Sequence, residues 1–162
     1  MLINGNDPKM LNISNATIVT DDPQTIDLPL ITVTARASFN YDTFVDDRTT
    51  VETARVYKTR IKGLRKPILL DIDGDSMSPQ LNPGTRVLAS EVDSSDWQYI
   101  TGVVAVSFKN QFVVKRIKEN ISIETNNITL YSDNEKGGFF IVSMSDINAI
   151  WKITEIVKAK VE

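Results

Sequence analysis

A serine and a lysine are the residues of this chain whose types and spacing could do chemistry. Ser76 lies in residues 73–84 (DGDSMSPQLNPG), directly after the apolar run 67–72 and within a turn marked by prolines. A serine where a strand ends and the chain bends is well placed to be a nucleophile. A tight turn after Gly74, which would allow close backbone approach, could aim the amides of Asp75 and Ser76 at one oxyanion. The same residue types also fit an ordinary turn.

Lys115 is the candidate base for this serine. Counting by twos along residues 112–117 places Lys115 on one strand face with Val113 and Ile117. Burial among apolar neighbours disfavours the charged ammonium and lowers the pKa of a lysine. A neutral amine can then take the proton of a serine hydroxyl. A lysine at a sheet edge, with its ammonium in solvent, explains the strand pattern equally well.

The chain contains no histidine and no cysteine. These two absences exclude a Ser-His-Asp triad, a cysteine peptidase, a thiolate zinc site and a disulfide framework. Asp71, Asp73 and Asp75 alternate as magnesium ligands could, although a solvated acidic strand face is favoured. We therefore predict no metal site and no cofactor.

Composition indicates a globular protein rather than a membrane or nucleic-acid-binding one. The 162 residues carry a formal net charge of −3, which gives this chain no electrostatic reason to bind nucleic acid by itself. No run approaches the length of an apolar membrane span, and the N-terminus lacks a signal-peptide pattern. We expect one cytoplasmic domain without membrane contact.

The apolar alternation predicts a mainly β fold of curved, partly closed antiparallel sheets. Residues 1–25 read as a linker or arm and 26–162 as the domain, with residues 41–53 and 93–99 as loops and Pro29 placing the first strand at a sheet edge. The clearest hairpin joins 103–108 to 112–117. The expected strands are residues 26–34, 55–61, 67–72, 86–89, 103–108, 112–117, 121–124, 128–132, 139–143 and 148–157.

The order of Ser76 in GDSMSP and Lys115 in VVKRI resembles the LexA-type self-cleaving serine peptidase family, which includes phage repressors and UmuD. Residues 130–134, similar to the family's serine-x-asparagine turn, and the closing strand 147–153 extend the resemblance. It implies the LexA/signal-peptidase-like fold, with Ser76 as nucleophile and Lys115 as general base. The backbone amides of Asp75 and Ser76 would stabilise the oxyanion.

The resemblance also implies that the substrate is the chain's own N-terminal arm, cut near residues 35–39. The family usually cuts between a small residue and glycine, and the corresponding bond here is Ala37-Ser38. Serine in place of glycine restricts the backbone and adds a side chain, so self-cleavage is expected to be slow or lost. Whether the arm enters its own cleft or its neighbour's stays open.

The role implied is that of the regulatory, dimerising domain of a transcriptional repressor of the phage or SOS-response kind. Residues 2–10 are similar to the tail that follows the helix-turn-helix domain in such repressors, so DNA binding is expected through a domain not in this chain. A recombinase filament would act as co-protease. The long apolar strand at residues 149–157 favours a homodimer. The alternatives are a UmuD-like polymerase-accessory subunit and a non-catalytic dimerisation module of the same fold.

Overall fold

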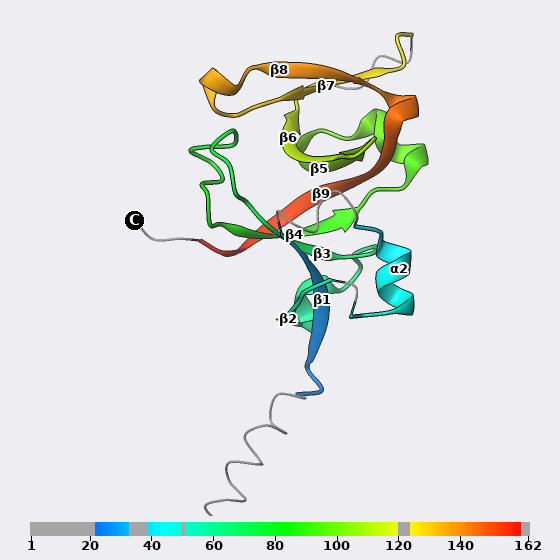
Figure 1. The fold of residues 1–162 in the computed structure, drawn as a ribbon, viewed down its shortest axis with the longest axis vertical. Helices are drawn as coiled ribbons and strands as arrows, with labels where there is room; N and C mark the ends of the chain where they lie inside the picture. The colour runs from blue at the N-terminus through cyan, green and yellow to red at the C-terminus, as the bar shows by residue number, and fades with distance from the viewer. Residues whose placement is uncertain (1–21, 33–38, 50, 120–123, 160–162) are drawn as a thin grey trace, which may run out of the picture.

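Nine strands form one mixed sheet in the computed structural model, which describes residues 22–32, 39–49, 51–119 and 124–159 (Figure 1). The strand order is β2-β1-β3-β4-β9-β5-β6-β7-β8, so the expected mainly β fold is confirmed. The sheet is open, and its one parallel pair is β1 with β3. The strands are β1 Thr25–Ile31, β2 Thr53–Tyr57, β3 Ile68–Asp71, β4 Arg86–Glu91, β5 Gly102–Phe108, β6 Gln111–Ile117, β7 Asn127–Tyr131, β8 Phe139–Ser143 and β9 Ile147–Lys158.

The long strand β9 lies in the middle of the sheet, between β4 and β5. Side chains alternate along a strand, so its two faces cover different parts of the core. Trp151 packs in a cluster with Ile72 and Met77, whereas Ile150 packs in a second cluster with Val104 and Ile117. A third cluster lies under the first strands and contains Leu28, Leu30, Val56, Leu69 and Leu88.

A short helix, α2 Tyr41–Asp46, replaces part of the loop expected at residues 41–53. Asn40 caps it, because its side-chain oxygen accepts a hydrogen bond from Thr43 N at 3.0 Å. Phe44 is 2% exposed and fastens the helix to the core. The acidic composition suggested a loop, but the cap and this buried ring were sufficient to form one and a half turns of helix.

Pro29 does not place β1 at an edge, because β1 lies between β2 and β3. Pro29 pairs with Thr53 at the end of the antiparallel ladder, and the parallel pairs with β3 begin at the next residue, Leu30. The proline therefore sits where one ladder stops and the other starts, so its missing N–H interrupts neither. The edge strand at this end of the described sheet is β2.

Four of the connections contain a turn of 3-10 helix: η2 Lys58–Ile61, η3 Ser94–Tyr99, η4 Glu135–Gly137 and η5 Met144–Asp146. The strand expected over residues 55–61 therefore ends at Tyr57, and η3 occupies the expected loop. Asp93 caps η3 by accepting from Ser95 N. The expected β5/β6 hairpin is present, whereas the strand expected at 121–124 falls almost wholly outside the described residues. Within the described chain, no helix is long and apolar enough to cross a membrane.

Candidate active site

Ser76 and Lys115 line the same pocket, which lies between the turn after β3 and strand β6. The structure thus brings together the two residues that the sequence pattern selected. The other lining residues are Ile72, Asp73, Gly74, Met77, Phe112, Val113 and Val114. Aliphatic and aromatic side chains thus form one part of the wall, and Asp73 and Ser76 belong to its polar part.

The Ser76 turn is held at its base and at its buried side. Where β3 ends, Asp71 accepts two hydrogen bonds from Arg86 on β4, at 2.7 and 2.9 Å. Gly84 N then donates to Ile72 O, which closes the turn. Met77 is 1% exposed and anchors the chain in the core. Ser76, its neighbour, is half-buried at the pocket.

Lys115 projects from a strand whose next neighbour covers only part of it. β6 pairs with β7 at one position, Arg116 with Tyr131, so the Ser76 turn approaches the remainder of β6. Lys115 Nζ donates a hydrogen bond to Ser132 Oγ at 3.0 Å. Burial lowers the pKa of Lys115 from its ordinary value of 10.5. A lower pKa gives a larger share of neutral amine, the form that can act as a base.

Asn134 fastens the Ser76 turn through two carbonyl groups. Its backbone N–H donates to Ser76 O at 2.9 Å, and its side-chain Nδ2 donates to Asp75 O at 3.1 Å. A trans peptide points its N–H opposite to its C=O, so holding Asp75 O also fixes the direction of the Ser76 N–H. Among the described residues, the N–H groups of Asp75 and Ser76 have no hydrogen-bond partner.

The loop after β7 is in turn tied to β6. Arg116 donates to both carboxylate oxygens of Asp133, at 2.6 and 2.8 Å, and the Asp133 side chain is only 10% exposed. Two consecutive residues of β6, Lys115 and Arg116, thus bond to two consecutive residues of the loop, Ser132 and Asp133. This fork sets the distance between the lysine and the loop that holds the serine turn.

Gly137 is the glycine that permits close approach in this site. A Cβ at Gly137 would come within 2.5 Å of Ser132 Cβ and Oγ and 3.8 Å of Ser76 Cβ. A Cβ at Gly74 would meet nothing within 4 Å, so the close approach expected at Gly74 is absent among the described residues. The requirement for a small residue belongs to the loop opposite the serine turn.

Ser132, Asn134 and Gly137 were not assigned to the site by the sequence reasoning. The serine and the asparagine belong to the turn that carries part of the family resemblance, and no chemical role was expected of either. A polar turn with two glycines after an apolar strand was the available signal, but it does not say which surface the turn faces.

Two further expectations concern the cleavage bond and the acidic strand face. The Ala37-Ser38 bond lies outside the described residues. Asp71 does not stand free on an acidic strand face, because Arg86 pairs with it. The part of the chain that the structure describes contains no group of three or more histidine, cysteine or carboxylate side chains that could hold a metal ion.

Comparison with protein families matches residues 29–151 to the Peptidase S24-like family, a span that runs from β1 into β9 and includes every site residue described above. The chain belongs to the Peptidase S24-like family. A search of curated proteins found no match. This membership and the mainly β sheet support a LexA-like peptidase domain.

Proposed function

We propose that this chain is the self-cleaving, dimerising regulatory domain of a transcriptional repressor, acting by a dyad of Ser76 and Lys115. The observation that carries the proposal is the shared pocket, in which burial lowers the pKa of Lys115 beside Ser76. Membership of the Peptidase S24-like family supports it. DNA binding belongs to a helix-turn-helix domain not in this chain.

In the proposed reaction, the neutral amine of Lys115 takes the hydroxyl proton of Ser76 as Oγ attacks the carbonyl carbon of Ala37. The amides of Asp75 and Ser76 stabilise the resulting oxyanion. The protonated amine then gives its proton to the leaving amino group of Ser38, and water hydrolyses the ester with Lys115 as base. Because the bond belongs to the same polypeptide, the attack is effectively unimolecular.

Ser132 has a supporting role in this proposal. Its hydroxyl oxygen accepts from Lys115 Nζ and keeps the amine inside the pocket. Asn134 and the Arg116–Asp133 pair keep the serine turn and the lysine strand at a constant separation. Positioning of this kind matters because a nucleophile and its base must lie within hydrogen-bond reach during proton transfer.

The test is incubation of the pure protein at alkaline pH with intact-mass measurement of the fragments. We expect two fragments that meet at the Ala37-Ser38 bond, none in Ser76→Ala or Lys115→Ala, and faster cleavage in Ser38→Gly. Ser78→Ala is the matched control, since Ser78 lies in the same turn but does not line the pocket. Cleavage that persists in Ser76→Ala, or that maps outside residues 35–39, would overturn the proposal.

A further inference from the structure

Strand β1 lies upstream of the predicted cleavage bond and yet is an interior strand of the sheet. It forms five antiparallel pairs with β2, Thr25 with Tyr57 through Pro29 with Thr53. It also forms two parallel pairs with β3, through Leu30 and Ile31. In the described sheet, β2 has no neighbour other than β1. The N-terminal side of the bond is therefore built into the fold.

The last four residues of β1 are buried, whereas its first three are half-buried. Leu28 is 3% exposed, Leu30 6% and Ile31 0%. Leu28 and Leu30 belong to the cluster under the first strands, whereas Ile31 belongs to the cluster that contains Trp151. On the surface, Asp27 accepts from Arg55 of β2 at 2.9 Å. Removing β1 would expose apolar surface on two clusters and unpair β2.

The chain downstream of the bond is held by a separate set of contacts. The Phe39 ring lies 6.1 Å from the Trp151 ring and 6.5 Å from the Tyr41 ring, measured between centroids. At the start of α2, Asp42 accepts from Lys66 Nζ at 2.9 Å. Both sides of residues 33–38 are thus attached to the same body.

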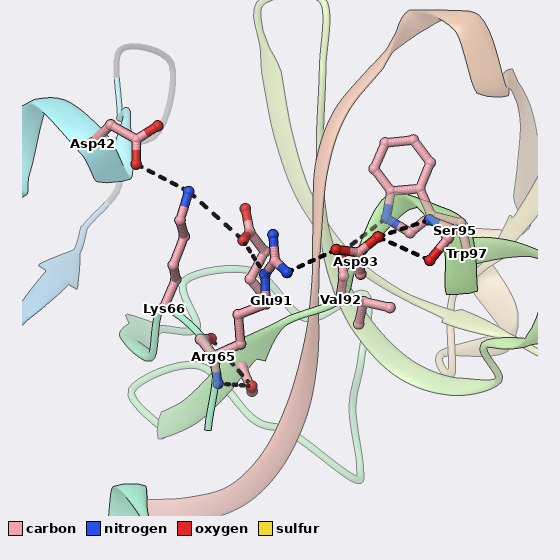
Figure 2. Close-up of polar contacts among 9 residues, drawn as sticks. Asp42, Arg65, Lys66, Glu91, Val92, Asp93, Ser95 and Trp97 are labelled. Carbon is pink, nitrogen blue, oxygen red and sulfur yellow. Dashed lines mark hydrogen bonds and ion pairs between the residues drawn. The ribbon is translucent and has the colours of Figure 1, made fainter. Parts of the chain in front are cut away.

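The attachment of α2 continues into a polar network (Figure 2). Lys66 Nζ also lies 3.9 Å from Glu91 Oε2, and that oxygen accepts from Arg65 Nε at 3.1 Å. Arg65 Nη1 donates to Asp93, the cap of η3, at 2.7 Å. These groups are mostly exposed, so the network supplements the aromatic contacts rather than replacing them.

We infer that a cut within residues 33–38 nicks this protein without separating it. The N-terminal fragment stays bound through β1, which remains inserted between β2 and β3 as a non-covalent strand. Only the position of the natural cut rests on the proposed function, since retention follows from the pairing and burial of β1. Separation is then a second step, in which β1 leaves the sheet and β2 loses its partner.

The test uses the full chain carrying Ser76→Ala, with the recognition sequence of a specific protease inserted between Ala35 and Arg36. After complete cutting, the two fragments are expected to elute together in native gel filtration and to separate in denaturing electrophoresis. Prompt elution of the N-terminal fragment by itself would overturn the inference. Because an external protease makes the cut, a chain that cannot cleave itself leaves this test intact, so the two proposals fail separately.

A pair of variants measures what β1 contributes. Leu28→Ala in the same background is expected to speed release of the N-terminal fragment by about tenfold or more, because it removes a buried side chain from the bound strand. Gln24→Ala, at an exposed position before β1, is expected to release at the parent rate. Equal rates for the two variants would contradict the inference.

If the Leu28→Ala protein does not fold, a competition experiment tests the same inference. A peptide of residues 22–32, added in excess to the nicked parent, is expected to replace the N-terminal fragment over time in native gel filtration. No replacement at saturating peptide, with the fragment still bound, would mean that contacts other than β1 hold it.

Discussion

Two lysines in the described chain have a lowered pKa, and only one of them faces the serine. Burial lowers the pKa of Lys115, and burial together with the positive charge of Arg116 lowers that of Lys152. Lys152 Nζ donates to the backbone oxygen of Thr101, whereas Lys115 lines the Ser76 pocket. A perturbed pKa therefore does not identify the base by itself, and the geometry of the pocket does.

The first prediction at this scale concerns pH. The rate of self-cleavage should rise with pH, because only the neutral amine of Lys115 accepts a proton. It should level off below pH 10.5, the ordinary lysine pKa, because burial lowers the pKa of Lys115. Lys115→Arg should abolish the reaction, since a guanidinium stays protonated. Fragment yields at a series of pH values measure this, with Lys152→Met as the control expected to keep the profile. A rate that falls with rising pH would exclude Lys115 as base.

At the scale of elements, the loop between β7 and β8 is the scaffold of the site. It bonds to β6 through Ser132 and Asp133, and to the serine turn through Asn134. The nucleophile and the base lie on different parts of the chain, and this third segment contacts both. The loop therefore determines their relative position more directly than either β3 or β6 does.

Gly137→Ala tests this scaffold. The added methyl group would overlap Ser132, so the loop must shift, and we expect a loss of about 1–3 kcal/mol in the free energy of unfolding together with slower cleavage. Gly74→Ala is the matched control for stability, since a Cβ there meets nothing within 4 Å. Urea denaturation of both variants measures the difference. Equal stability of the two would mean that the loop accommodates the methyl group.

Elements with a local signal could be predicted from the sequence, and elements that depend on distant partners could not. β8 has the predicted bounds, Phe139–Ser143, because a short apolar run between two turns identifies a strand without reference to its neighbours. Helix α2 depends on Phe44 finding the core, and the interior place of β1 depends on β3. Neither contact can be predicted from the residues of the segment itself.

The same division applies to the site. Residue type, burial pattern and resemblance selected Ser76 and Lys115, which line one pocket. Asn134 acts across a long sequence separation, on the carbonyl oxygen of Asp75. Gly137 acts within its own loop, because its missing side chain leaves room for Ser132. Neither feature leaves a pattern in the residues that surround it.

At the scale of the whole molecule, the apolar pattern of β9 has an explanation within one chain. Ile150 is 0% and Trp151 3% exposed, because a central strand is covered on both faces. The expected homodimer was based on this apolar pattern. Because one chain already buries Ile150 and Trp151, these two residues no longer argue for a dimer. Ile156, near the end of β9, stays 49% exposed.

We still predict a homodimer, with the contact at the exposed end of β9. Sedimentation at micromolar concentration should give the dimer, and Ile156→Glu should shift it to monomer because a charge at a symmetric apolar contact is buried twice. Tyr99→Glu, at an exposed ring on η3, is the control expected to stay dimeric. A monomer in the parent chain would contradict the prediction. A dimer unaffected by Ile156→Glu would move the contact elsewhere, for instance to the exposed Phe139 and Ile141 of β8.

The central place of β9 also bears on synthesis of the protein. β9 is the last of the nine strands along the chain, and β4 and β5 have no direct pairing without it. On the ribosome, the two halves of the sheet can therefore join only after residues 147–158 have emerged. Ser76 is translated far earlier, yet the Trp151 and Phe112 rings that pack together beside its pocket cannot meet until then. We expect the nascent polypeptide to stay uncut until residues 147–158 have emerged from the ribosome.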